Sequence, residues 1–260
     1  MPLTLSILDK TGVERARAEG PSEVVLVADL DYAPGDTILL TGAQPGSHLM
    51  LALDQGMAPA LVYFVGPELR YPVPFGDDRI PYPPGLFRDA RHRLWVREAR
   101  AAEVGQRRNL ALNPWDAASV SGVFPHGTAN VETRGEAVFA ARNALDGEAA
   151  NHDHGVWPFT SWGINQDPEA ALTLDFGREV VLDEIGLRLR ADFPHDAWWQ
   201  AASLVFSDGS EVTLDLKKTA ETQYFALPPH KVTWLRLERL IKADDPSPFP
   251  ALTQIEAWGV

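Results

Sequence analysis

The stretch KVTWLRLERL (residues 231–240) carries the pattern on which the fold class depends. Lysine, arginine and glutamate alternate along it with five apolar residues, which are Val232, Trp234, Leu235, Leu237 and Leu240. Such alternation is typical of a β-strand that buries one face and leaves the other in water. The stretch therefore predicts a half-buried strand.

Comparable short stretches, rich in β-branched residues and bounded by Gly, Pro or Asp, run along the whole chain. They are EVVLVADL (23–30), DTILLTG (36–42), HLMLALD (48–54), APALVYFVG (58–66), ALTLDF (171–176), EIGLRLRA (184–191), ASLVFSD (202–208), EVTLDL (211–216), TQYFAL (222–227) and TQIEAWG (253–259). SDGSEV (207–212) predicts a hairpin, because Asp208-Gly209 suits a type I′ turn. Many short strands without a βαβ rhythm predict an all-β chain of two β-sandwiches.

Few segments depart from this pattern. We expect only short helices, of about three turns in 96–106 and a turn or two in 134–147, where apolar residues recur at helical spacing. The proline-rich segment 70–90 predicts an ordered surface loop. A polar stretch, GQRRNLALNP (105–114), predicts the domain boundary, giving an N-terminal domain of 1–108 and a C-terminal domain of 109–260.

Composition excludes several classes of protein. The 260 residues include 45% hydrophobic and 23% charged residues, as in a globular rather than a disordered chain. The absence of cysteine excludes disulfides, thiolate metal sites and a cysteine nucleophile. No apolar run approaches the roughly 18 residues of a membrane span. No signal peptide is visible, which favours the cytoplasm unless a leader has been removed.

The net charge of −13 is concentrated in the second half. Residues 1–108 hold 12 Lys and Arg against 14 Asp and Glu, a net of −2, whereas residues 109–260 hold 11 against 22, a net of −11. An acidic domain repels phosphate groups, so neither nucleic acid nor an anionic membrane is expected as a partner. A neutral ligand, or one bridged by a cation, fits better.

Motifs of the second half resemble those of the coagulation factor 5/8 type C, or discoidin, family. They are NLALN (109–113), ARNALDG (141–147), TSWGI (160–164), LTLDFGREVVLDEIGLRL (172–189) and IEAWG (255–259), in the family's order. The resemblance implies a galactose-binding-like jelly roll of antiparallel strands, with ligand loops at one end. It also implies a carbohydrate-binding domain without catalytic activity.

The resemblance further implies a structural calcium ion beside the first helical turn and the last strand. Calcium takes six to eight oxygen ligands. The matching positions are Asn143 and Glu148 through carbonyls, Asp146 through its side chain, Thr160 or Ser161, and Glu256. Alternatively, Asp146 simply caps the turn at Gly147 and Glu256 is solvated. The long segment between Gly147 and Trp162 leaves the ligand at that end open.

In lectin-like relatives the sugar lies on loops at the same end, against a His, one or two Arg and an aromatic ring. Sugar hydroxyls need directional partners, and sugar C–H faces pack on aromatic rings. By resemblance, Arg190 is the sugar-contacting arginine. The other candidates lie in 151–163 and 188–200, and they are Trp157, Asp192, His195, Asp196, Trp198 and Trp199. Adjacent residues of a strand point to opposite faces, so we expect one of the two neighbouring tryptophans to pack inward.

Simpler interpretations compete for several of these residues. Trp162 is expected in the core. His152 and His154 favour a solvated loop over half of a metal site, because no third ligand is identifiable. Arg190 and Asp192 alternatively form only a salt bridge that shapes the loop, worth about 0–1 kcal/mol at a surface.

No catalytic signature is recognisable: the sequence lacks a G-x-S-x-G elbow, a P-loop, an H-E-x-x-H motif and a dinucleotide fingerprint. The sequence therefore predicts a carbohydrate-binding protein rather than an enzyme. Two alternatives stay open, namely an assembly protein that binds another protein or its own copies through the same loops, and a cryptic polysaccharide-acting enzyme. An accessible aromatic ring beside Arg190 would favour sugar, whereas a broad apolar patch would favour protein. The N-terminal domain has no assigned role, and its segment 70–90 is expected at the seam between domains.

Overall fold

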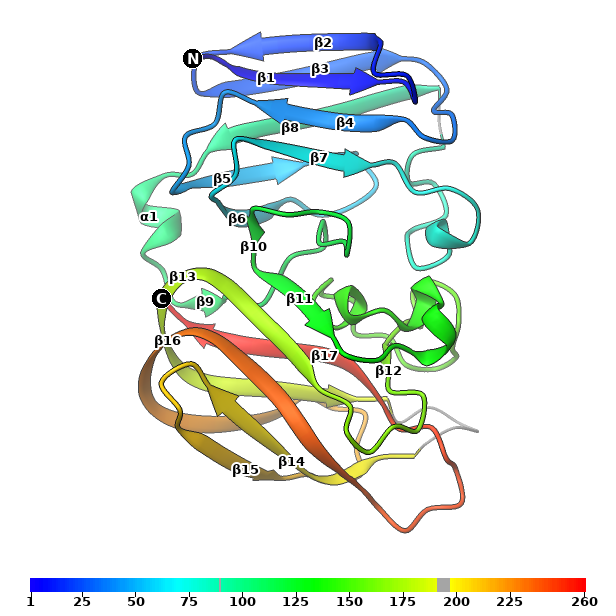
Figure 1. Cartoon of the computed structure of the whole chain (residues 1–260), viewed down its shortest axis with the longest axis vertical. Helices are drawn as coiled ribbons and strands as arrows, with labels where there is room; N and C mark the ends of the chain where they lie inside the picture. Colours follow the sequence, from blue (N-terminus) through cyan, green and yellow to red (C-terminus); the bar gives the residue numbers. More distant parts are fainter. Residues whose placement is uncertain (89, 191–196) are drawn as a thin grey trace.

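The computed structural model describes residues 1–88, 90–190 and 197–260. The chain forms two β-sandwiches stacked along its long axis, the N-terminal one drawn mainly in blue and cyan and the C-terminal one mainly from green to red (Figure 1). All strand pairs are antiparallel. The prediction of an all-β chain with two sandwiches is confirmed.

The N-terminal sandwich consists of a four-stranded sheet, in the order β2-β1-β4-β7, and a five-stranded sheet, in the order β10-β6-β5-β8-β3. Alternate residues of each strand point into the space between the sheets, where Leu5, Ile38, Leu49 and Phe64 are fully buried. The strands are β1 (Leu3–Leu8), β2 (Glu14–Gly20), β3 (Glu23–Asp29), β4 (Thr37–Thr41), β5 (Ser47–Ala52), β6 (Ala60–Phe64), β7 (Glu68–Pro72), β8 (Arg91–Glu98) and β10 (Val123–Phe124).

The C-terminal sandwich is one sheet that folds over on itself. Its two longest strands, β13 (Leu172–Leu189) and β16 (Gln223–Lys242), pair along most of their length and change register at irregularities that bend them (Figure 1). This curvature lets a single sheet enclose its own core. The other strands are β9 (Arg108–Asn109), β11 (His126–Ala129), β12 (Trp162–Gly163), β14 (Trp199–Phe206), β15 (Glu211–Asp215) and β17 (Ala251–Gly259).

The segment after the expected boundary serves both sandwiches. Arg108 and Asn109 pair with β17 of the second sheet. Trp115 and Val123, which follow them in the sequence, are buried in the core of the first sandwich. The indole Nε1 of Trp115 also donates to the carbonyl of Ala58 at 2.9 Å. The segment between the domains is therefore not a simple linker, because it contributes residues first to the second sandwich and then to the first.

Non-strand segments are short. One α-helix, α1 (Ala101–Val104), follows β8, which continues to Glu98 through the start of the segment expected to be helical. A 3-10 turn, η1 (Gly76–Arg79), lies in the proline-rich loop, and three more follow β11, namely η2 (Thr133–Gly135), η3 (Ala137–Phe139) and η4 (Ala141–Ala144). The short turns expected in 134–147 are thus present.

The hairpin between β14 and β15 lies where the sequence predicted it, but its turn differs. Gly209 has a φ of +84°, whereas Asp208 does not share the positive φ that a type I′ turn requires. The amide of Gly209 donates to Phe206 O, and the amide of Phe206 donates to Ser210 O. This is a three-residue loop that ends in a left-handed glycine, the next most common hairpin connection.

Candidate functional site

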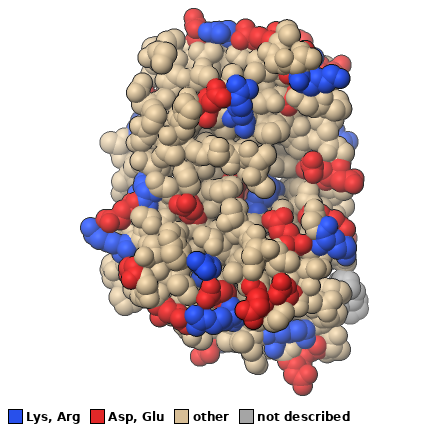
Figure 2. All heavy atoms as spheres, in the orientation of Figure 1, with Lys and Arg blue, Asp and Glu red and all other residues tan. Residues whose placement is uncertain are grey.

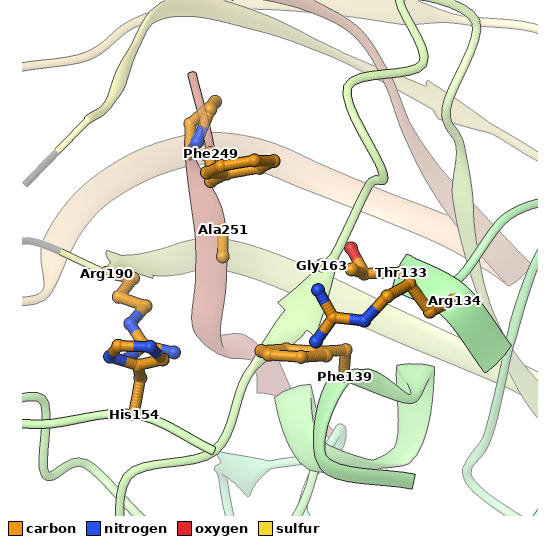
Figure 3. A pocket seen from close by; sticks show the side chains of 9 residues that line it. Thr133, Arg134, Phe139, His154, Gly163, Arg190, Phe249 and Ala251 are labelled. Carbon is orange, nitrogen blue, oxygen red and sulfur yellow. The ribbon is translucent and has the colours of Figure 1, made fainter. Parts of the chain in front are cut away.

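A cavity of about 230 Å³ opens at the loop end of the C-terminal sandwich. Four segments enclose it: the turns after β11, the loop before β12, the end of β13 and the connection from β16 into β17. Its lining residues are Thr133, Arg134, Phe139, His154, Gly163, Arg190, Phe249, Pro250 and Ala251 (Figure 3). Arg190 is the residue that the sequence placed in a sugar site.

Arg190 is held rigidly on one side of this cavity. Its backbone amide donates to Ala251 O at 2.9 Å, which fixes the residue against the start of β17. Its guanidinium donates to Asp153 O at 2.5 Å and to Ser161 Oγ at 3.4 Å, and the residue is only 4% exposed. A guanidinium with so little freedom is preorganised, which reduces the entropy lost when a ligand binds.

His154 lines the same cavity as Arg190 (Figure 3). Its side chain is 40% exposed, and its backbone amide donates to the carboxylate of Asp153 at 2.8 Å. A neutral imidazole offers one donor and one acceptor, so it can pair with a hydroxyl in either sense. The expectation that His154 belongs to a solvated loop is therefore refined, because the residue lines a cavity.

Phenyl rings supply the apolar part of the cavity. Phe139 lies on the side opposite Arg190, and the guanidinium carbon of Arg134 is 5.5 Å from the centroid of its ring (Figure 3). The same guanidinium donates two hydrogen bonds to the carboxylate of Glu136, from Nε at 2.5 Å and from Nη2 at 2.7 Å. Phe249, from the β16–β17 connection, is 45% exposed. An exposed phenyl ring at the mouth of a cavity is a surface on which a sugar ring can stack.

Position 163, where β12 lines the cavity, has no room for a side chain. A Cβ at this position would lie 2.6 Å from Thr133 Oγ1 and 3.2 Å from Phe139 Cβ. Thr133 in turn accepts a hydrogen bond from the amide of Asn165 at 2.9 Å. The close approach of β12 to Thr133 therefore sets the position of Phe139.

The structure corrects the expectations for the tryptophans. Trp199 is 1% exposed and packs in the core, with its ring 6.4 Å from that of Trp162, so it cannot contact a ligand. Trp162 is itself fully buried, as expected. Trp198 packs against the edge of the same core and does not line the cavity. Of the two adjacent tryptophans, Trp199 is the inward one.

Trp157 also lies elsewhere. It lines a separate cavity of about 240 Å³, together with Pro81, Pro83, Asp146 and Glu148. Its backbone amide donates to Ile80 O at 3.0 Å, which ties the loop of the second sandwich to the proline-rich segment of the first. Trp157 is thus a residue of the domain junction. Asp192, His195 and Asp196 lie outside the described residues.

Phe249, Phe139 and Arg134 were not predicted from the sequence to belong to the site. Phe249 had a usable signal, because it lies in the proline-flanked loop directly before the last strand. Phe139 lies in the segment 134–147, where the spacing of the apolar residues predicts helical turns and gives no sign of a binding site. Such residues become neighbours only through the folding of the sheet.

Four of the five expected calcium ligands form two contacting pairs, Asn143 with Ser161 and Asp146 with Glu148. The amide of Asn143 lies 3.4 Å from Ser161 O, and Asp146 Oδ1 accepts from the amide of Glu148 at 2.8 Å. Asp146 is buried, and this burial raises the pKa of its carboxyl to about 6. Glu256 has other partners, because its carboxylate accepts from Tyr224 Oη at 3.2 Å and Trp258 Nε1 at 2.7 Å.

The residue of β17 that reaches Asn143 and Asp146 is Gln254. Within residues 1–88, 90–190 and 197–260, no group of three or more His, Cys, Asp or Glu side chains is placed to hold a metal ion. His152 and His154 accordingly do not form part of such a group there.

Charged side chains of both signs are interspersed over the visible face of the C-terminal sandwich (Figure 2). Several of them form ion pairs, such as Arg107 with Asp183 and Glu184. In the described part of the chain, no helix is both long enough and apolar enough to cross a membrane.

No protein-family model and no curated protein sequence matches the chain. Solved structures do resemble it. One is a chitosan-binding module of a chitosanase/glucanase from Paenibacillus sp. IK-5, at 17% identity and a TM-score of 0.40 over 59% of this chain and 100% of that chain. Another is a fucose-binding module from Streptococcus pneumoniae, at 17% identity and a TM-score of 0.43 over 59% and 98%.

A third structure is a family 32 carbohydrate-binding module from C. perfringens, solved with galactose, at 14% identity and a TM-score of 0.39 over 51% of this chain and 91% of that chain. These neighbours are carbohydrate-binding modules, and their likeness to this chain is one of fold. At such identities, a ligand for this chain has to be argued from its own residues.

Proposed function

We propose that this chain is a carbohydrate-binding protein without catalytic activity, and that it holds a glycan in the cavity between Arg190 and Phe249. The observation that carries the proposal is the combination, in one concave site, of a fixed guanidinium with phenyl rings. An accessible aromatic ring near Arg190 is the feature that favours sugar over a protein partner. The nearby rings Phe139 and Phe249 belong to a small cavity and not to a broad apolar face.

Each element of the site matches one part of a sugar. The planar guanidinium of Arg190 suits neighbouring hydroxyl oxygens, which accept its N–H groups in a fork geometry. The C–H face of a pyranose buries apolar area when it stacks on Phe249. His154 can donate to or accept from a further hydroxyl.

The size of the cavity favours a small part of a glycan. Its volume of about 230 Å³ lies below the range of about 300–1,000 Å³ that drug-sized ligands occupy. A single terminal sugar ring, with the rest of the glycan in solvent, is the ligand that fits. We expect weak binding, with a Kd on the order of 0.1–1 mM, or about −4 to −5.5 kcal/mol.

Charge also favours a neutral glycan. The second domain has a net charge of −11, which disfavours phosphate-rich ligands. Galactose and fucose, which are neutral, are the first sugars to screen, together with chitosan, whose amino groups an acidic domain does not repel.

The test is a glycan-array screen of the full chain, followed by titration of the best sugar. Phe249→Ala is the informative variant, because Phe249 is exposed and its loss should leave the fold intact. We expect about tenfold weaker binding, the equivalent of roughly 1.4 kcal/mol. Arg190→Ala should abolish binding altogether. The absence of any signal from folded protein would overturn the proposal and direct the search to a protein partner.

Matched controls are available on other faces of the same sandwich. Tyr224 is an exposed aromatic residue on β16, and Arg239 is an exposed arginine paired with Glu211. Neither lines the cavity. Tyr224→Ala and Arg239→Ala should therefore bind the sugar as the unmodified protein does. Loss of binding in these variants would place the sugar outside the cavity.

A further inference from the structure

Three oxygen atoms converge on the side-chain amide of Gln254, a buried residue of β17. The amide nitrogen Nε2 lies 2.7 Å from Asn143 O, 2.8 Å from Asp146 Oδ1 and 2.6 Å from Thr253 O. Its partner atom Oε1 accepts from the backbone amide of Gly147 at 2.9 Å. One glutamine thus fastens the last strand to the turn of residues 143–147.

The orientation of this amide follows from its surroundings. An amide oxygen and nitrogen are told apart by their hydrogen-bond partners. On one side of Gln254 lies an N–H donor from Gly147, and on the other lie three acceptors. Reversing the amide would set an oxygen against oxygens and an N–H against an N–H. The nitrogen must therefore face Asn143 and Asp146.

A cation already faces Asp146 on its other side. The guanidinium of Arg142 lies 3.8 Å from Asp146 Oδ2 and donates to Asn143 Oδ1 at 2.9 Å. It also donates to Asp116 O and Pro114 O, both at 2.9 Å. Arg142 is buried, and an arginine is never deprotonated in a protein. The negative charge of Asp146 therefore has a permanent partner.

These residues do not fit a calcium ion. Calcium needs six to eight oxygens at about 2.3–2.6 Å, commonly including carboxylates. Here an N–H group occupies the point where the oxygens converge, and a cation would repel it. The carboxylate of Glu148 accepts from the amide of Ala150 at 3.0 Å, and that of Glu256 is bound by Tyr224 and Trp258. Asp146 is thus the one expected carboxylate directed at this point.

We propose that Gln254 and Arg142 together replace the metal ion at this position, so that the turn of residues 143–148 is held to β17 without calcium. The glutamine amide bridges the two segments, and the guanidinium balances the charge of Asp146. The proposal concerns how the turn is held, and it stands whether or not the cavity beside Arg190 binds a glycan.

The decisive measurement compares the melting temperature of the full chain in calcium and in EDTA, together with calorimetric titration of calcium into the protein. We expect the same melting temperature in both solutions and no saturable heat. A rise of several degrees in calcium, with one ion bound per chain, would overturn the proposal. This comparison uses the unmodified protein, so it does not depend on whether any variant folds.

Two variants sharpen the result. Gln254→Ala should lower the melting temperature by roughly 4–10 °C, because buried acceptors lose their donor, and calcium should not restore it. Gln254→Glu should be similarly destabilised in EDTA, because two carboxylates then face each other, but calcium should stabilise it. Gln223, whose amide bridges to the backbone of Lys217 at the surface, provides the matched control. Gln223→Glu should show no response to calcium, and recovery of Gln254→Ala by calcium would contradict the proposal.

Discussion

The guanidinium carbon of Arg142 lies 4.5 Å from the ring centroid of Tyr82, and this contact joins the two sandwiches. Tyr82 belongs to the proline-rich loop of the first domain, where its hydroxyl lies 3.2 Å from that of Tyr71. Arg142 belongs to the turn η4 of the second domain. A buried cation over an aromatic ring is attracted by the ring's quadrupole, by about 2 kcal/mol when both are desolvated. The segment 70–90 is therefore the seam that the sequence predicted.

Replacement of Arg142 should destabilise the protein more than any surface substitution. Arg142→Ala leaves the carboxylate of Asp146 buried without its cation and the carbonyls of Pro114 and Asp116 without a donor. Loss of one partner of a buried pair costs about 3–5 kcal/mol. The measurement is the free energy of unfolding in urea.

Two further variants, one conservative and one at the surface, serve as comparisons for Arg142→Ala. Arg142→Lys keeps the charge but loses the guanidinium fork that reaches two carbonyls. Its free energy of unfolding should therefore lie between that of the unmodified protein and that of Arg142→Ala. Arg239→Ala, at an exposed pair, should change the free energy of unfolding by less than about 0.5 kcal/mol. A loss below about 1 kcal/mol for Arg142→Ala would show that the junction does not depend on this contact.

His126 should make stability depend on pH near neutrality. Its Nδ1 lies 2.7 Å from Asp116 Oδ1, and this hydrogen bond raises the pKa of the imidazole above its usual value, against the opposing effect of burial. A raised pKa means that the folded state binds the proton more tightly than the unfolded state. The stabilisation is therefore complete below the unfolded pKa of about 6.5 and is lost as pH rises through the folded pKa.

The comparison that isolates this effect uses His126→Gln, which cannot titrate in this range. The free energy of unfolding of each protein is measured between about pH 5.5 and 8.5. The advantage of the unmodified protein over the variant should shrink as pH rises. A difference that stays constant, or grows with pH, would contradict the assigned direction of the pKa shift.

Local patterns in the sequence predicted the strands well, because a strand that buries one face needs apolar residues at alternate positions. In the stretch 231–240, Leu235 and Leu237 are buried and alternate with less buried charged residues, whereas Val232 is buried out of step with them. The hairpin at Gly209 was also located correctly, although its turn type depends on the φ of Asp208, which composition does not determine.

Local patterns could not predict the whole site, because its residues come from four separate segments of the chain. Arg190 was predicted through a family resemblance, and it does line the cavity, while Phe139 and Phe249 are more than 100 positions apart in sequence and come together only there. The residue of the last strand expected at the turn of Asp146 was Glu256, as a further calcium ligand, but Gln254, two positions away on the same strand, reaches Asp146. Sequence patterns place a strand, but hydrogen bonding decides which of its side chains reaches a given turn.

Substitution of Trp199 by alanine should lower the free energy of unfolding more than the same substitution at Trp198. Trp199 is fully buried against Trp162, so Trp199→Ala would open a large cavity in the core, at a cost of about 3–5 kcal/mol. Trp198 is half-buried, and a smaller loss follows from Trp198→Ala. Urea unfolding of both variants provides the comparison. Equal losses, or a larger loss in Trp198→Ala, would contradict the placement of Trp199 as the more deeply buried of the two side chains.

Gly163→Ala should impair sugar binding through the position of Phe139. The added methyl group would lie 2.6 Å from Thr133 Oγ1 and 3.2 Å from Phe139 Cβ, so the turns η2 and η3, which carry these residues, have to move. Overpacking of this kind costs about 1–3 kcal/mol of stability. We expect sugar binding to weaken by about tenfold as well, because the displaced ring no longer lines the cavity.

Gly85→Ala is the matched control, since a Cβ at Gly85 would have no atom within 4 Å. This variant should keep both the stability and the affinity of the unmodified protein. Calorimetric titration with the best sugar from the array, on all three proteins at a temperature where each is folded, separates the two effects. Unchanged affinity in Gly163→Ala, despite reduced stability, would remove Phe139 from the binding site and leave Phe249 as its aromatic surface.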